Sequence, residues 1–161
     1  MLNLRSTIAA LTLLLGACAT ATPYQPLRDG EGYAEQKIEA NRYRLTFNGN
    51  FRTKKQTVEN FLLYRAAELT LQNGGSYFVI ADQDTSADTR YTQTVNVVGG
   101  DVFATRGLLG VGVSTAVPAT EYQAQADIVI YKGKKPEDNP RAYDARQIQL
   151  NLGPTITRPK E

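Results

Sequence analysis

One helical stretch between two strand patterns constrains the fold of this chain most. Residues 53–73 carry apolar side chains at helical spacing, which predicts a helix with one face in a core. The stripe consists of Val58, Phe61, Leu62, Ala66 and Leu69, widened by Leu63, Ala67 and Leu71. Thr53 and Gln56 fit a capping box at the start of this helix, and Gly74 suits the left-handed position that ends it.

The segments on either side of this helix predict strands. Residues 42–48 alternate, with Tyr43, Leu45 and Phe47 on one face, whereas residues 77–81 form the continuous apolar run of a central strand. Together with the helix they predict a βαβ unit with parallel strands. Two more strands are expected at 91–98 and 122–131, the latter with four inward residues: Ala124, Ala126, Ile128 and Ile130.

A second helix is expected near the carboxyl end. Asn139 is the predicted N-cap and Pro140 the first helical residue, and Gly153-Pro154 ends the helix. Its apolar stripe is Ala145, Ile148 and Leu152. We therefore expect a single α+β domain over 39–156, in which the βαβ unit is extended into a three- to five-stranded mixed sheet. The long helix covers one face, and the second helix packs at the edge or on the same face.

The amino terminus has the features of an export signal. Arg5 precedes an apolar run, residues 8–15, that is too short to span a bilayer. Leu15, Gly16 and Ala17 lead directly into Cys18, the only cysteine. This order resembles the lipobox of bacterial lipoproteins, which implies that the signal peptide 1–17 is removed and that Cys18 is acylated to anchor the chain in membrane lipid. The alternative is a plain secretory signal with a chance cysteine.

The lipobox resemblance also implies a location. Lipoprotein processing and sorting machinery would act on the chain, and alanine rather than aspartate at position 19 favours the periplasmic face of the outer membrane. Residues 18–38 carry prolines and glycines without sustained periodicity, so they are expected to form a lipidated tether. Tyr24, Leu27 and Tyr33 are the side chains that would dock part of it. Residues 157–161 are expected to be a frayed tail.

Composition excludes several classes of function. After loss of Arg5 with the signal peptide, 17 basic and 16 acidic residues remain, which is no nucleic-acid-binding signature. The chain has no histidine, and acylation would consume its one thiol, so the usual general base, the cysteine nucleophile and the common metal ligands are missing. We expect no catalytic residue, no metal and no cofactor. A hydrolase that uses carboxylates is the least favoured function.

Two polar or glycine-rich segments remain open to interpretation. Asp82, Asp84, Ser86 and Asp88 have the spacing of a calcium loop, but Ala87 stands where glycine is needed and Gln93 where glutamate is needed, so a polar hairpin loop is favoured. Three interpretations of residues 99–118 stay open: a mobile hairpin, a surface for a partner or an oligomer, and a membrane contact. The candidate contact residues are Val102, Phe103, Leu108, Leu109, Val111 and Val113.

Several segments resemble a family of small proteobacterial envelope lipoproteins that has no assigned activity. They are residues 57–60 (TVEN), 63–70 (LYRAAELT), 143–146 (YDAR) and 152–154 (LGP). The resemblance implies no functional residue apart from the acylated Cys18. The leading hypothesis is therefore a non-enzymatic module that binds or supports another envelope component. The alternative is a lipoprotein that binds a lipid or small apolar ligand between the helix and the sheet.

Overall fold

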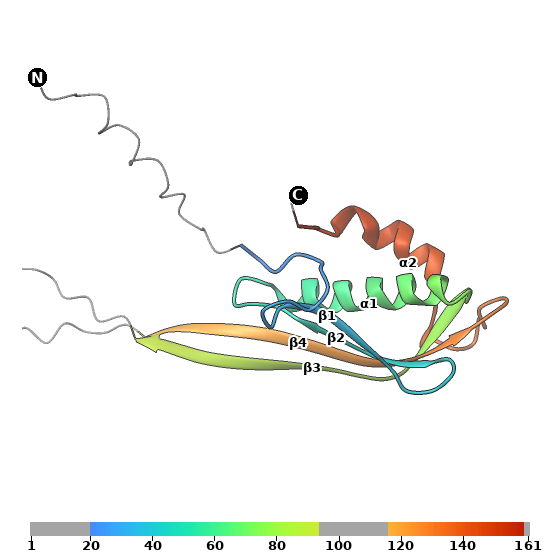
Figure 1. Cartoon of the computed structure of the whole chain (residues 1–161), viewed down its shortest axis with the longest axis horizontal. Helices are drawn as coiled ribbons and strands as arrows, with labels where there is room; N and C mark the ends of the chain where they lie inside the picture. The colour runs from blue at the N-terminus through green and yellow to red at the C-terminus, as the bar shows by residue number, and fades with distance from the viewer. Residues whose placement is uncertain (1–19, 94–115, 160–161) are drawn as a thin grey trace, which may run out of the picture.

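The protein is an α+β domain, as the sequence predicts. It is built on a five-stranded antiparallel sheet. The computed structural model describes residues 20–93 and 116–159. Its elements are β1 (Gly32–Lys37), β2 (Arg42–Asn48), α1 (Lys55–Gln72), β3 (Tyr77–Gln93), β4 (Ala116–Tyr131), β5 (Ala142–Asp144), α2 (Ala145–Leu152) and the 3-10 turn η1 (Gly153–Thr155). Figure 1 shows both helices on the same side of the sheet, with α2 packed against α1.

The strands follow the order β1-β2-β4-β3-β5, so α1 connects two strands that are not neighbours. β2 and β3 each pair antiparallel with β4, and they therefore run in the same direction on either side of it. The expected mixed sheet is thus corrected, because every pairing between named strands is antiparallel. In a simple βαβ unit, β3 would pair directly with β2. Here β4 lies between them, because it pairs with β3 over a long stretch and with β2 on its other edge.

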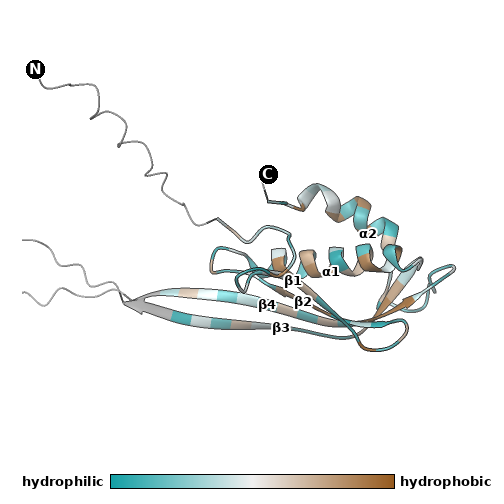
Figure 2. Cartoon of the chain, viewed as in Figure 1, coloured by the Kyte–Doolittle hydropathy of each residue, from teal (hydrophilic) through white to brown (hydrophobic). Residues whose placement is uncertain are grey.

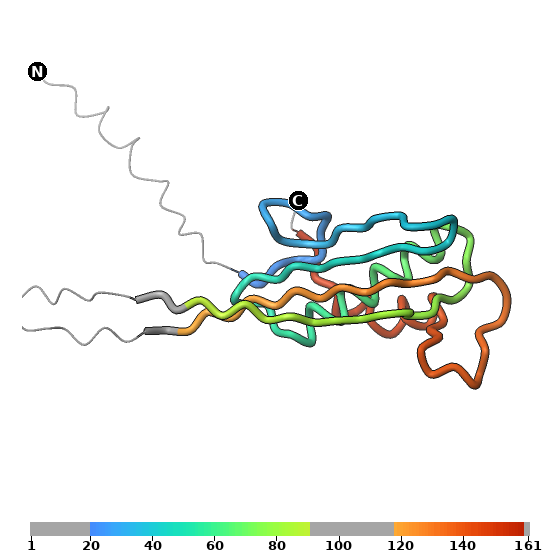
Figure 3. Tube along the Cα trace, turned by 90° about the horizontal axis from the view of Figure 1, so that it is seen from below, coloured from blue at the N-terminus to red at the C-terminus, as the bar shows by residue number. Residues whose placement is uncertain are grey.

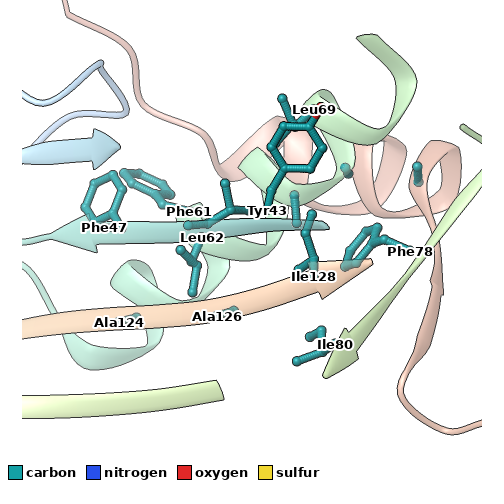
Figure 4. Packing of buried hydrophobic residues seen from close by; sticks show 14 of the residues in the cluster. Tyr43, Phe47, Phe61, Leu62, Leu69, Phe78, Ile80, Ala124, Ala126 and Ile128 are labelled. Carbon is teal, nitrogen blue, oxygen red and sulfur yellow. The ribbon is translucent and has the colours of Figure 1, made fainter. Parts of the chain in front are cut away.

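The core forms between α1 and the inner face of the sheet. The helical stripe is buried as expected, although Leu63 and Leu71 are only partly buried beside the main cluster. The sheet contributes residues that alternate along β2, β3 and β4: Tyr43, Leu45, Phe47, Phe78, Ile80, Ala124, Ala126, Ile128 and Ile130. Figure 4 shows these side chains gathered between the helix and the strands. The rings of Phe47 and Phe61 meet edge to face, with centroids 5.2 Å apart.

The start of α1 differs from the predicted capping box. Lys54 is the N-cap and makes no side-chain capping bond. The hydroxyl of Thr53 instead accepts a hydrogen bond from the Thr22 amide at 2.8 Å and donates to the Asn50 side chain at 2.9 Å. The predicted N-cap at Thr53 is wrong, because the Thr53 hydroxyl binds the distant segment that contains Thr22. The other end agrees with the sequence, since Gly74 follows the C-cap with a φ of 69°.

β3 is longer than the sequence patterns predict. It runs without interruption from Tyr77 to Gln93 and joins the two strands expected at 77–81 and 91–98, of which residues 94–98 lie outside the described residues. The polar stretch between them was expected to be a turn, but it pairs with β4 after a register shift between Ile80 and Asp82. Pairing with a long partner strand therefore overrides the local turn preference of this stretch.

The second helix begins later than expected. Asn139 is not its N-cap, because the Asn139 side chain and carbonyl accept hydrogen bonds from Arg141 and Ala142 in a turn that leads into β5. The N-cap of α2 is Asp144, whose carboxylate accepts a hydrogen bond from the Gln147 amide at 2.9 Å. Ala145 is buried, and α2 ends before Gly153 as predicted.

Both ends of the chain are more tightly packed than expected. Much of the proposed tether 18–38 belongs to the domain: Tyr24 is only 1% exposed, and β1 pairs with β2 along its whole length. Tyr33 is partly buried, whereas Leu27 stays exposed. Of the expected frayed tail, 157–161, the structure describes residues 157–159, and there the carbonyl of Thr157 accepts a hydrogen bond from the Tyr24 amide at 2.7 Å. Figure 3 shows the described tail beside the blue segment that precedes β1.

Candidate functional site

Two strands extend well beyond the body of the domain and form the most distinctive surface of the described residues. β2 pairs with β4 only from Val129 to Gln123, and β5 pairs with β3 only from Tyr77 to Val79. Residues Ala87–Gln93 and Ala116–Tyr122 therefore pair with each other alone. We call this two-stranded extension the β3–β4 arm. At about 3.3 Å per residue it is roughly 20 Å long, and Figures 1 and 3 show it leaving the body of the domain.

The described surface of the arm is mainly polar. Asp88, Thr89 and Arg90 are exposed, and the hydroxyls of Thr89 and Thr120 meet across the two strands at 3.1 Å. Arg90 lies 3.7 Å from Asp88 in an ion pair whose side chains are 73% and 68% exposed. Figure 2 shows mainly hydrophilic and neutral residues along the arm. An isolated two-stranded ribbon is only marginally stable. Tyr122, at the base of the arm, packs against the core cluster, whereas Asp88 to Arg90 lie farther out and are exposed.

The candidate contact residues of the glycine-rich segment lie outside the described residues. These are Val102, Phe103, Leu108, Leu109, Val111 and Val113. Gln93 pairs with Ala116, so the two described ends that flank this segment lie side by side. That pairing is what the hairpin interpretation requires. Contact of the segment with a partner or a membrane stays a prediction.

The calcium-like residues do not form a loop. Asp82, Asp84, Ser86 and Asp88 occupy alternate positions of a strand, so the four side chains extend over about 20 Å and cannot all bind one ion. Within residues 20–93 and 116–159, no three acidic, histidine or cysteine side chains come close enough together to bind a metal. On the neighbouring strands, Nε and Nη2 of Arg44 donate to the two carboxylate oxygens of Asp127 at 2.8 and 3.0 Å, and these bonds lower the pKa of that carboxyl.

The space between α1 and the sheet is nearly filled. The cavity lined by Leu62, Ala66 and Ile128 has a volume of about 10 Å³, which is the space of roughly one water molecule. The described residues thus leave no room there for the lipid or apolar ligand of the alternative hypothesis. A larger open groove of about 310 Å³ lies at the base of the arm, where Asp88 and Glu121 face Glu31 and Asn48.

The amino-terminal segment is fastened beside this groove. The Thr22 side chain is 2% exposed, and its hydroxyl donates to Glu31 at 2.6 Å and accepts from the Asn50 amide at 2.9 Å. The Asn50 side chain also donates to the carbonyl of Thr20 at 2.8 Å. Together with the bond from the Thr22 amide to Thr53, these contacts fix Thr20–Thr22 to the loop that follows β2. Cys18 and the other residues of the predicted lipobox, Leu15 to Ala17, lie outside the described residues.

A partly buried ionic cluster joins α1 to three other segments of the chain. Arg65 is 8% exposed and donates to Glu68 and to Glu35 of β1, both at 2.9 Å. The Tyr24 hydroxyl donates to the same Glu68 carboxylate, and Arg158 of the tail donates to its other oxygen at 3.0 Å. We call these five residues the Glu68 cluster. The sequence predicts only the Arg65–Glu68 pair, because the other three residues are distant in the chain.

The electrostatics of the Glu68 cluster indicate a structural role. Burial and the Glu68 carboxylate raise the pKa of the Tyr24 hydroxyl. Burial disfavours the charged form of Arg65, but the hydrogen bonds to Glu68 and Glu35 outweigh it and raise the pKa of the guanidinium. Both groups therefore keep their ordinary protonation states near neutral pH. A cluster that holds its protons this firmly fastens segments together and is unsuited to proton transfer.

Two further observations bear on function. None of the helices within the described residues has the length and apolar character that a bilayer-spanning helix needs. Comparison of the chain with family models, with curated proteins and with solved structures finds no match. The features that bear on function are therefore the predicted lipobox, the β3–β4 arm and the packing of the amino-terminal segment.

Proposed function

We propose that this protein is a lipid-anchored envelope lipoprotein that binds another component of the cell envelope through the β3–β4 arm. The arm carries this proposal, because it extends beyond the packed domain and exposes polar groups on a paired backbone. Surfaces that a domain does not need for its own stability are common sites of interaction. The lipobox at Leu15–Cys18 supports the lipid anchor, and the composition supports a non-enzymatic role.

The exposed edges of the arm favour a protein partner. From Asp82 to Gln93, the outer edge of β3 has no neighbouring strand among the described residues. Such an edge offers backbone donors and acceptors to an added strand, and Asp84 and Asp88 supply charge that opposes uncontrolled self-pairing. The partner class that fits this edge is a protein with an extended segment and positive charge.

In-cell photocrosslinking tests the proposal. A photoreactive phenylalanine analogue placed at Arg90 on the arm is expected to capture a defined envelope protein. The same analogue at Gln147, which is exposed on α2, serves as the matched surface control. Capture at position 90 should disappear in a Cys18→Ser background, which lacks the anchor. Identical products from positions 90 and 147 would exclude the arm as the binding surface.

A further inference from the structure

The packing of the amino-terminal segment determines how far the domain can lie from its lipid anchor. Thr20 and Thr22 are held by Asn50 and Thr53, so the chain is attached to the domain from the first described residue onward. Only Ala19 separates Cys18 from Thr20 in the chain. Because consecutive Cα atoms are 3.8 Å apart, the Cα atom of Cys18 lies within about 8 Å of that of Thr20. An acyl group on Cys18 would therefore bring this end of the domain to the lipid surface.

The loop that holds Thr20–Thr22 presents an aromatic ring and positive charge at this end. It covers residues 49–54, between β2 and α1, and we call it the anchor loop. Phe51 is 49% exposed, and the guanidinium of Arg52 lies 5.4 Å from the centre of its ring. Lys54 is exposed, and Lys55 follows at the start of α1, 3.8 Å from Glu59. Aromatic rings beside cations are favoured at the boundary between lipid headgroups and acyl chains, above all with anionic lipids.

We propose that the anchor loop is a second membrane contact, in which Phe51 enters the headgroup region while Arg52 and Lys54 face lipid phosphates. This inference deepens the proposed function and rests on its lipid anchor. The acyl group on Cys18 supplies the attachment, and a surface contact beside it would fix the orientation of the domain on the membrane. The loop and the anchor are coupled because Asn50 and Thr53 of this loop bind Thr20 and Thr22.

The same geometry relates the arm to the membrane. The Gly49 amide of the anchor loop donates to the carbonyl of Tyr122 at the base of the arm at 2.9 Å, so both features belong to one end of the sheet. Figure 1 shows the arm and the blue start of the described chain at the same end of the domain. The opposite end of the sheet carries Tyr131, and α2 carries Leu150, which is 76% exposed. These two residues mark faces that would lie on lipid if the orientation were different.

Tryptophan fluorescence tests this orientation directly, because the chain has no tryptophan. Three single-tryptophan variants of the full acylated protein, F51W, L150W and Y131W, are bound to vesicles of phosphatidylethanolamine and phosphatidylglycerol. Half of the preparations carry acyl chains brominated near the headgroup. We expect F51W to lose most of its emission in brominated vesicles and to shift to the blue, whereas L150W and Y131W keep theirs. All three positions are exposed, so the substitutions leave the core intact.

The readouts separate the contact from the anchor. Co-flotation with vesicles and the intact mass report acylation, with Cys18→Ser as the control, and quenching is measured only on floated protein. Floated F51W that keeps its emission in brominated vesicles would overturn the inference while leaving the lipid anchor standing. Quenching of L150W or Y131W in place of F51W would overturn it too, by placing a different face on lipid. Failure to float would refute the proposed anchor itself.

Discussion

At the scale of single residues, the Glu68 cluster explains how both chain ends become part of the domain. Burying Arg65 or Glu68 alone would cost free energy, because a buried charge loses its hydration. Arg65 and Glu68 bind each other, Arg65 also binds Glu35, and Glu68 also binds Arg158, and these bonds compensate for the lost hydration. The Tyr24 ring adds edge-to-face contacts with Phe61 and Tyr64, at centroid distances of 5.6 and 5.3 Å. A few side chains thus join the amino-terminal segment, β1, α1 and the tail.

Tyr24→Phe tests this cluster through pH. Removing the hydroxyl deprives Glu68 of one donor, so we expect about 1–2 kcal/mol of destabilisation near neutral pH. The ordinary tyrosine pKa is 10.0 and burial raises that of Tyr24, so the unfolded chain releases this proton at lower pH than the folded chain. The contribution of the hydroxyl is therefore complete below pH 10 and is lost as the pH rises further. Urea unfolding of both proteins across this range measures the difference.

The control for this experiment is Tyr131→Phe, because Tyr131 is 41% exposed at the far end of β4. Its unfolding free energy should follow that of the wild type over the whole range. A difference between wild type and Tyr24→Phe that stays constant above pH 10 would contradict the assigned role of the Tyr24 hydroxyl.

At the scale of elements, competition for short polar side chains decides where the helices begin. Thr53 and Asn139 both look like N-caps in the sequence, yet each binds elsewhere: Thr53 to the amino-terminal segment, and Asn139 to the turn before β5. α2 instead starts at Asp144, immediately after the three residues of β5. A helix of eight residues is too short to be stable alone, so it depends on this cap and on packing against α1.

Asp144→Ala is expected to destabilise the protein by about 1 kcal/mol, because the Gln147 amide loses its acceptor at the start of α2. Asn151→Ala is the matched control, since Asn151 is exposed in the last turn of the same helix and alanine favours helix formation there. Thermal unfolding followed by circular dichroism compares the two variants. Equal losses in both would show that the Asp144 cap contributes nothing specific.

At the scale of the whole molecule, the fold divides into a packed domain and an arm. The buried side chains from α1 and the strands form one contiguous cluster, whereas the arm beyond Ala87 and Tyr122 consists of paired backbone with exposed polar groups. The anchor loop and the base of the arm share one end of the sheet. This arrangement keeps the arm near the anchored end and leaves the core independent of whatever the arm binds.

Replacing residues 88–121 by Asn-Gly is expected to leave a cooperatively folded domain, because that dipeptide closes a two-residue hairpin between Ala87 and Tyr122. The free energy of unfolding should change by no more than about 1 kcal/mol, since a two-stranded ribbon is only marginally stable. Urea unfolding measures the change, and copurification from envelope extracts should show loss of the captured partner. A non-cooperative transition in the truncated protein would mean that the arm contributes to the core.

Local patterns in the sequence were sufficient for the α+β class, the buried stripe of α1, the inward residues of β2 and β4, and the glycine after α1. These features follow from periodicity and from backbone preferences within a few residues. The lipobox likewise depends only on neighbouring residues, and the acylation of Cys18 stays a prediction. Contacts between distant segments set the strand order, the full length of β3, the starts of both helices and the Glu68 cluster. Sequence periodicity carries no information about which distant residue donates a hydrogen bond to Thr53 or to Glu68 in the folded chain. Only the packed chain brings Thr20–Thr22 to the anchor loop, and that contact gives the candidate membrane-facing end its position.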